Sequence, residues 1–364
     1  MLFGVPPVLV QVRGDLRPAL LSRLRGDADE VEPHPRVYDQ LGGAVNGAVL
    51  ASDPSTASVA RLTELWTSAD EAGIYCLHVA EHHATEGVAG GAVSVVLAHI
   101  GHVTSTIRIG SGGIMLPNHN PFVIAEQFGA LDALFPGRID LGLGRAPGAA
   151  PILAQALRKD LSRAAEFFPQ DVVELRALFT GDPELPIRAT PGFGAQVELW
   201  MLGSSLFGAQ LAAQLGLPYA FASHFAPDHL DAALETYRRQ FRPSAALDRP
   251  HVMAAMTVIC GESDAEAELL ASSQDQAFVR LRSGDPGKLP PPVPGYRDSL
   301  PGSARAMLER LSVARAVGSP ETVATKIEAF IERTAADEII VSGATYDPAA
   351  RRRSLELTAR ALSG

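Results

Sequence analysis

Three short apolar runs, each ending abruptly in glycine or polar residues, constrain the fold of this chain more than any other feature. They are IYCLHVAEHH (74–83), TIRIGSGGIMLPNHNP (106–121) and GRIDLGLGRAP (137–147). The residues between them, 92–104 and 123–135, have apolar side chains at helical spacing. This alternation is typical of successive βα units in a parallel sheet. The chemistry of such sheets lies where the strands end, and here those ends carry His82, Gly112–Gly113 and Arg145.

The same alternation continues along most of the chain. The predicted strands are 47–52, 74–80, 106–112, 138–144, 197–203, 218–224, 253–260 and 338–343. The predicted helices are 58–72, 92–104, 121–135, 158–179, 205–215, 228–241, 263–273, 320–335 and 348–362. Eight βα units predict an α/β fold of the (β/α)8 TIM barrel type. An open doubly wound sheet is the alternative, because periodicity does not show closure.

Two segments do not fit the repeating pattern. Residues 281–303 are rich in proline and glycine and form an insertion before the last unit, which is either a lid over the barrel mouth or a passive loop. Residues 1–45 are of mixed character and read as an N-terminal extension. We therefore expect the barrel to occupy residues 46–364.

The composition of the chain argues against a nucleic acid or a membrane as a partner. The chain has a formal net charge of −10, and its Arg351–Arg353 run lies in a helical pattern that favours a solvated face over a nucleic-acid contact. No apolar run reaches the length of a membrane span, and the N-terminus lacks a signal-peptide pattern. Cys76 and Cys260 lie in apolar runs, as expected for packed thiols in a reducing compartment. We expect a cytoplasmic protein with neither membrane nor nucleic acid as a partner.

Adjacent histidines follow the strand at 74–80. His82 is the better candidate for a general acid/base or hydrogen-bond donor, and His83 is expected to be structural. A zinc site would need more ligands. His119 and His224 are the available candidates, but no HxH or HExxH pattern supports them, and we predict no metal.

Two other strand ends suggest a phosphate site. Arg145 supplies a fixed cation that binds phosphate in a planar, charge-assisted way. Gly203, Ser204 and Ser205 lead into a helix whose first backbone N–H groups are free to bind an anion, although plain helix capping would give the same pattern. Gly112 and Gly113 would allow close approach of a flat ligand, although a bulge or tight turn is the simpler interpretation of glycines there.

Several ordered motifs resemble the bacterial luciferase-like, flavin-dependent monooxygenases. They are VAEHH, RIGSGGIMLPNHNP, AEQFGALDALFPGRIDLGLGRAPG, LWMLGSSLFGAQLAAQLGLP and VGSPETVATKIEAFIERTAADEIIV. The resemblance implies a (β/α)8 barrel that binds reduced FMN, or in one branch a deazaflavin. It places His82 near the flavin's oxygen adduct and a cis peptide at Gly112–Gly113 against the flavin ring. It also places Arg145, Gly203, Ser204 and Ser205 around the flavin phosphate.

The activity that the resemblance implies is a two-component monooxygenase. Such an enzyme would receive FMNH2 from a separate flavin reductase, form a C4a-(hydro)peroxyflavin with O2, and oxygenate a small substrate, for example an aromatic or polyketide-type metabolite in antibiotic biosynthesis. A deazaflavin-dependent hydride transfer and a non-catalytic flavin-binding protein are the alternatives. A homodimer through 92–104 and 121–135 is also expected. The aromatic residues that either line an apolar pocket or belong to the core are Phe122, Phe221, Phe225 and Tyr296.

Overall fold

A closed barrel of parallel strands forms the centre of the molecule. The computed structural model describes residues 10–13, 41–44, 67, 69, 74–84, 90–146 and 151–363. The barrel strands are β2 (Leu41–Ala44), β3 (Ile74–Val79), β4 (Arg108–Met115), β5 (Ile139–Gly144), β6 (Glu198–Gly203), β7 (Tyr219–Phe221), β8 (Val252–Cys260) and β10 (Glu338–Ser342). Strand β10 closes the barrel, because it pairs in parallel with β2 on one side and with β8 on the other. The predicted (β/α)8 barrel is confirmed, and the open-sheet alternative is wrong.

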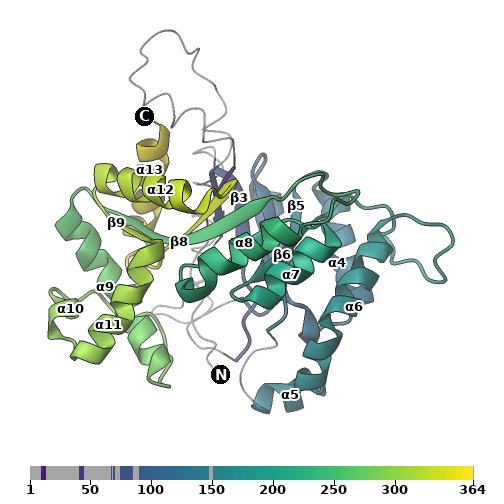
Figure 1. Ribbon diagram of the computed structural model, residues 1–364, viewed down its shortest axis with the longest axis horizontal. Helices are drawn as coiled ribbons and strands as arrows, with labels where there is room; N and C mark the ends of the chain where they lie inside the picture. The colour runs from purple at the N-terminus through teal and green to yellow at the C-terminus, as the bar shows by residue number, and fades with distance from the viewer. Residues whose placement is uncertain are drawn as a thin grey trace, which may run out of the picture.

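Helices surround this sheet (Figure 1). They are α3 (Val93–Val103), α4 (Pro121–Leu134), α5 (Pro151–Leu157), α6 (Leu161–Phe179), α7 (Leu206–Leu215), α8 (Leu230–Gln240), α9 (Asp264–Arg282), α10 (Tyr296–Ser299), α11 (Gly302–Leu311), α12 (Pro320–Thr334) and α13 (Pro348–Ser363). Short 3-10 turns are η2 (Leu116–Asn118), η3 (Pro227–His229) and η4 (Ser312–Ala314). The large hydrophobic core lies between the helices and the outer face of the sheet.

The structure differs from the predicted elements in a few places. The helix expected at 158–179 begins at Leu161, because Arg158 adopts a φ of 55° and Asp160 then caps α6 by accepting a hydrogen bond from Arg163 N. Helix α5, which precedes it, was not predicted. The strand expected at 218–224 ends at Phe221, so the following residues form a loop at the barrel mouth. Strand β9 (Arg315–Gly318) and helix α11 were not predicted, because both are short and follow a proline-rich stretch.

The N-terminal predictions are only partly covered by the described residues. The strand expected at 47–52 lies outside them. On the side away from β4, strand β3 pairs in parallel with β2. Strand β1 (Val10–Arg13) pairs antiparallel with β2, β3 and β10. Of the helix expected at 58–72, Thr67 and Ala69 are described and are helical. The domain boundary at residue 45 stays a prediction.

Side chains that point into the barrel explain where it is filled and where it is hollow. At the amino-terminal end the interior holds the charged side chains of Arg108, Asp140 and Glu198, which contact one another. A layer of apolar side chains lies above them, formed by Trp200, Ala220, Met253, Ala255 and Ile340. Nearer the carboxyl end the inward positions include small residues, namely Ala80, Gly112, Gly144 and Ala222. Because small residues cannot fill the barrel, its carboxyl end is hollow.

The proline- and glycine-rich insertion packs along α9. Arg297 binds the buried Asp275 at 2.8 Å, and Val293 N donates to Ser272 Oγ at 2.8 Å. Leu289 is buried against Ala277. None of residues 283–303 is among the residues that line the cavity at the barrel mouth. A lid function for this insertion stays a prediction.

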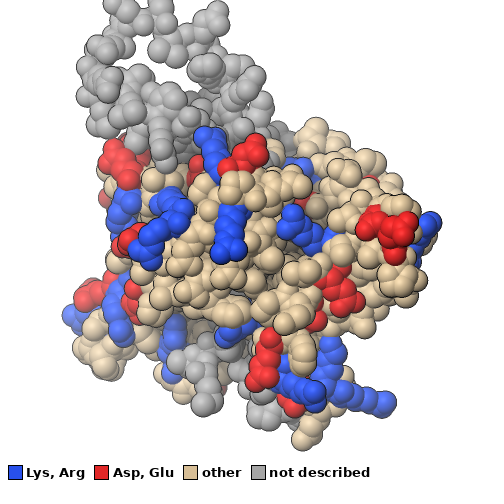
Figure 2. Space-filling model, turned by 45° about the vertical axis from the view of Figure 1, so that its right-hand side comes forward, with Lys and Arg blue, Asp and Glu red and all other residues tan. Residues whose placement is uncertain are grey.

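The surface and the helices add two observations on partners. On the face shown in Figure 2, basic and acidic side chains are interspersed, with no extended patch of one sign. Within the described part of the chain, no helix combines the length and the apolar character that a membrane crossing needs.

Candidate functional site

A cavity of about 560 Å³ opens at the carboxyl ends of the barrel strands. Its lining comes from most strands of the barrel, from β3 round to β10. All the site residues predicted from the sequence line it: His82, Gly112, Gly113, Arg145, Gly203, Ser204 and Ser205. Residues more than 120 positions apart in sequence are thereby brought into one site.

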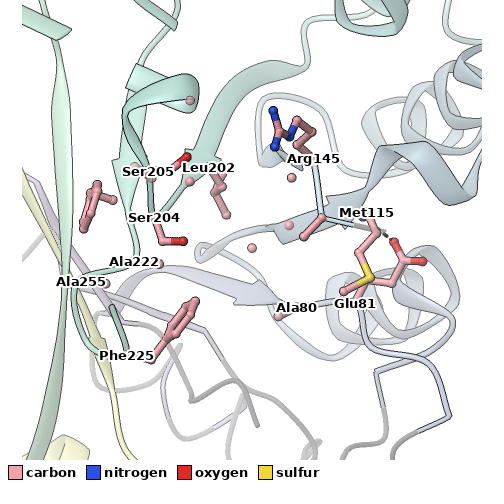
Figure 3. A pocket seen from close by; sticks show the side chains of 18 of the residues that line it. Ala80, Glu81, Met115, Arg145, Leu202, Ser204, Ser205, Ala222, Phe225 and Ala255 are labelled. Atoms are coloured by element: carbon pink, nitrogen blue, oxygen red, sulfur yellow. Dashed lines mark hydrogen bonds between the residues drawn. The ribbon is translucent and has the colours of Figure 1, made fainter. Parts of the chain in front are cut away.

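One side of the cavity has the features of an anion site. Arg145 follows β5, and its guanidinium lies over the ring of Phe207, 4.1 Å from the ring centroid. Ser205 is the N-cap residue of α7 and makes no side-chain capping bond, so its hydroxyl is available to a ligand. Figure 3 shows Ser204 and Ser205 on one side of the cavity, Arg145 across from them, and Phe225 below Ser204. A planar cation and a helix N-terminus together favour phosphate.

The backbone around Ser205 is held from behind. Tyr219 of β7 donates its hydroxyl to Ser205 O at 3.3 Å, and burial raises the pKa of this hydroxyl well above its ordinary value. The tyrosine therefore remains a neutral donor. It fixes the start of α7 without occupying the cavity.

Glycines bring strands β4 and β5 into close contact beneath the cavity. The Gly112–Gly113 peptide bond is cis, as the resemblance implied. A Cβ on Gly113 would lie 2.6 Å from Gly142 O, and one on Gly142 would lie 2.3 Å from Ser111 O. Contacts this short are not tolerated, so these glycines are needed for the two strands to pack. A side chain at Gly113 would therefore disturb the fold itself.

His82 lies in the cavity wall with its side chain half-buried. Burial lowers its pKa to about 4, although the nearby Glu81 carboxylate opposes that shift. Its backbone N–H donates to Gly90 O at 3.3 Å. At neutral pH the side chain can therefore donate from one ring nitrogen and accept at the other.

The neighbouring Glu81 connects several elements at the mouth. Its Oε1 pairs with Nε2 of His119 at 2.7 Å and with Nε2 of His83, and its Oε2 accepts from Met115 N at 2.8 Å. Burial would raise the pKa of Glu81, but the hydrogen bonds from His119 and His83 outweigh burial and lower it. The charged carboxylate thus ties the loop after β3 to the end of β4. His83 belongs to this network, which agrees with the structural role expected for it.

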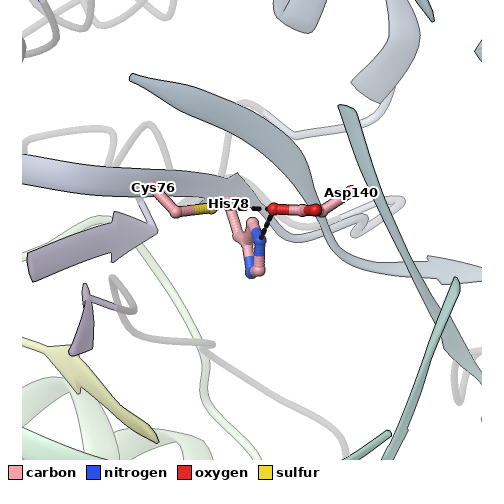
Figure 4. Close-up of side chains that lie close together, drawn as sticks. All are labelled: Cys76, His78 and Asp140. Atoms are coloured by element: carbon pink, nitrogen blue, oxygen red, sulfur yellow. Dashed lines mark hydrogen bonds and ion pairs between the residues drawn. The ribbon is translucent and has the colours of Figure 1, made fainter. Parts of the chain in front are cut away.

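Among the residues that the structure describes, two side-chain groups have donor atoms close enough together to hold a metal ion. One is Glu81, His83 and His119, and the other is Cys76, His78 and Asp140 inside the barrel (Figure 4). In the second group, Cys76 Sγ lies 3.1 Å from Asp140 Oδ2, and burial raises the pKa of the thiol. Arg108 already pairs with Asp140, and a cation there disfavours a metal. His224 joins neither group. The absence of a metal stays a prediction.

The structure identifies site residues that the sequence did not single out. Phe207 supports Arg145, Tyr219 supports Ser205, and Glu81 organises the histidine loop. The available signals were an aromatic residue in the first turn of the helix after the serines and an acidic residue directly before two histidines. Of the four aromatic residues considered for the pocket, Phe221 and Phe225 line it, whereas Phe122 and Tyr296 are not among its lining residues.

Comparison with known protein families and sequences gives a consistent result. The sequence model of the family described as luciferase-like monooxygenase matches residues 42–338. A "Luciferase-like monooxygenase" of Escherichia coli (strain K12) is 46% identical over 290 residues, covering 79% of this chain and 87% of the relative. The "Uncharacterized protein YvbT" of Bacillus subtilis (strain 168) is 45% identical, covering 88% and 94%. An N-acetyl-S-alkylcysteine monooxygenase of the same Bacillus strain is 33% identical, covering 59% and 66%.

Solved structures with the same fold extend the comparison. Apo-MsnO8 matches with a TM-score of 0.78 and 33% identity, over 87% of this chain and 96% of that one. The oxygenating constituent of 3,6-diketocamphane monooxygenase from Pseudomonas putida, in complex with FMN, matches with a TM-score of 0.63 and 18% identity, over 86% and 94%. The coenzyme F420-dependent tetrahydromethanopterin reductase from Methanopyrus kandleri matches with a TM-score of 0.58 and 15% identity, over 86% and 96%.

Proposed function

We propose, because the chain belongs to the luciferase-like monooxygenase family, that this oxygenase uses reduced FMN and O2 to oxygenate a small organic molecule at the mouth of its barrel. The observation that carries the proposal is the cavity itself. It joins a phosphate-type end at Arg145 and Ser204–Ser205 to a neutral, half-buried His82 across a glycine-lined surface.

The residues present fit a flavin mononucleotide. Arg145 and the N-terminus of α7 would hold the phosphate, since a guanidinium and free helix N–H groups both bind anions. Gly112 and Gly113 have no side chains and would let a flat ring approach the backbone. When bound, reduced flavin supplies the electrons that activate O2.

The chain's own residues would prepare the site for that chemistry. His82, neutral at pH 7, can donate a hydrogen bond to an oxygen atom in the cavity or pass a proton to it. Apolar side chains elsewhere in the cavity lining, among them Phe221 and Met253, would exclude water from the reacting oxygen. Glu81 holds the loop that carries His82 in place.

The proposal also specifies which flavin the site binds. One structural neighbour holds FMN and another depends on coenzyme F420, and at 18% and 15% identity both likenesses show the fold alone. We favour FMN because relatives with higher identity are named monooxygenases. A deazaflavin-dependent hydride transfer is the second candidate, and it would run without oxygen.

A separate flavin reductase is the proposed partner. The oxygenase component of a trigonelline monooxygenase, 18% identical, is named as one part of such a system.

Homodimerisation is also proposed. Its support is the set of exposed apolar side chains on α3 and α4, where Val95 is 69% exposed and Leu134 is 65% exposed. Light scattering that gives a monomer mass at micromolar concentration would contradict it.

Isotope labelling tests the proposed activity. The protein is combined with NADH, FMN, a flavin reductase and a panel of thioethers and ketones under oxygen-18 gas. We expect a product that carries one oxygen-18 atom and does not form when the oxygenase is omitted. Product that forms equally well without oxygen would instead indicate hydride transfer, and flavin binding without any turnover would indicate a flavin store or sensor.

A further inference from the structure

His224 is a buried polar side chain in the cavity for which the proposed chemistry has no role. It follows β7, lines the cavity and is 4% exposed. Its Nδ1 is buried and has no hydrogen-bond partner among the described residues. Its ring makes an edge contact with Phe225, with ring centroids 5.1 Å apart. Buried polar groups in folded proteins are nearly always paired, so an unpaired one at a cavity indicates a ligand that pairs it.

The fold of the surrounding loop does not depend on the imidazole. Ser223 Oγ donates to Ala255 O at 2.5 Å, and Ala222 N donates to Gly203 O at 2.9 Å. Arg282 Nη2 donates to Phe225 O at 3.3 Å. These bonds fix the backbone on both sides of His224. The imidazole is therefore held in a defined place while its Nδ1 has no partner among the described residues.

The wall around His224 is apolar. Phe221, Phe225, Met253 and Ala255 are among the lining residues on this side. Arg145, the cation suited to a phosphate, lies away from Phe225 in the cavity (Figure 3). Burial lowers the pKa of His224 to about 3, so the ring is uncharged at neutral pH. A neutral donor in an apolar wall suits an uncharged oxygen atom better than a carboxylate or a phosphate.

We propose that His224 is the specificity residue for the oxygenated substrate, and that the substrate has an apolar body with an uncharged carbonyl or hydroxyl oxygen that hydrogen-bonds this imidazole. The inference rests on the proposed function, because it assigns one wall of that cavity to the substrate and leaves the other to the flavin. It names a substrate class by its chemistry: ketones, alcohols, and esters or amides with an apolar chain or ring.

The test uses two probes of the same shape. Acetophenone has a carbonyl oxygen where α-methylstyrene has a CH2 group. Binding of each is measured by the change in the FMN absorbance spectrum of FMN-loaded protein. We expect wild type to bind acetophenone about tenfold more tightly, the effect of one net hydrogen bond at a buried donor. His224→Leu should abolish that preference, and His224→Asn, which keeps a donor near the Nδ1 position, should retain part of it.

Controls separate this proposal from the one on which it rests. His229→Leu, which changes an exposed histidine five positions away, should leave both affinities unchanged. The dissociation constant for FMN should be the same in wild type and all three variants. If wild type fails to bind FMN, the proposed function fails. If FMN binds normally but acetophenone has no preference, or if His224→Leu retains the preference, the role of His224 is overturned. Loss of FMN affinity in His224→Leu also overturns it, because the imidazole would then contact the flavin.

A second measurement does not require the leucine variant to fold. In wild-type protein labelled with nitrogen-15 at histidine, acetophenone should shift the His224 imidazole resonance, and α-methylstyrene should shift it much less. Equal shifts from both probes would contradict a hydrogen bond to the carbonyl oxygen.

Discussion

At the scale of single residues, Arg145 is the cation that would hold the flavin phosphate. Arg145→Ala should weaken FMN binding by about 1.5–3 kcal/mol, the range for a hydrogen bond to a charged group. Riboflavin, which lacks the phosphate, should bind wild type and variant alike. Arg188→Ala is a matched control, because Arg188 also lies over an aromatic ring, that of Phe193, and neither residue lines the cavity. Equal losses for FMN and riboflavin would contradict the assignment, and titration by fluorescence quenching measures both.

The two adjacent histidines should differ in a way that kinetics can resolve. His82→Ala should lower turnover about 100-fold or more with FMN affinity nearly intact, since an acid/base group contributes on this scale. His83→Ala should act mainly through Glu81, with which His83 is paired, and so should disturb the loop rather than the chemistry. If both variants lose turnover to the same extent at unchanged stability, the choice of His82 is wrong.

Titration of the same histidines offers an independent check. Burial lowers the pKa of His82 to about 4, whereas the hydrogen bond to Glu81 raises the pKa of His83 above its ordinary value. As pH falls, His83 should therefore gain its proton at a higher pH than an ordinary histidine, while His82 stays neutral until well below that pH. Histidine NMR signals followed as pH falls report both. A His82 resonance that titrates near pH 6.5 would show that the imidazole is hydrated rather than buried.

At the scale of elements, the close contact between β4 and β5 leaves room for a side chain at some glycines and not at others. A Cβ on Gly113 would lie 2.6 Å from Gly142 O, whereas one on Gly144 would lie 3.6 Å from its nearest neighbour, Ile114 O. Gly113→Ala should thus destabilise the fold by about 1–3 kcal/mol, as overpacking does, and Gly144→Ala should change stability little. Denaturant unfolding measures the difference. Equal stabilities of the two variants would show that the strands can separate without cost.

Many of the strands and helices could be predicted from the sequence, and individual elements show the physical reasons. Strands β3, β5 and β6 are continuous apolar runs that end in glycine or polar residues, so their positions and the polar groups at their ends were recognisable. Spatial contacts between side chains were not. Nothing in the local pattern shows that Phe207 lies under Arg145, or that Glu81 meets His119 from another strand end. His224 was considered as a zinc ligand from the sequence. Only the fold shows that it lies apart from the other candidate metal ligands.

At the scale of the whole molecule, a buried ion network links stability to pH. Burial would raise the pKa of Asp140, but its hydrogen bond with His78 and the charge of Arg108 outweigh burial and hold it well below its ordinary value. A depressed carboxyl pKa contributes stability above the unfolded value of about 3.9, and that contribution is lost as pH falls below it. Asp140→Asn should therefore destabilise the protein by about 3–5 kcal/mol at neutral pH.

The pH dependence distinguishes this electrostatic effect from a packing defect. The difference in unfolding free energy between wild type and Asp140→Asn should shrink as pH falls below about 4. Asp248→Asn, at an exposed position, should match wild type throughout. A difference that stays constant with pH would show that Asp140 acts through its shape rather than its charge.

Anaerobic titration of the protein with reduced FMN tests the central claim most directly. We predict saturable binding with a dissociation constant on the order of micromolar, weaker binding of reduced riboflavin, and weaker binding of reduced coenzyme F420. Tighter binding of reduced F420 than of reduced FMN, or no saturable binding of reduced FMN at all, would contradict it.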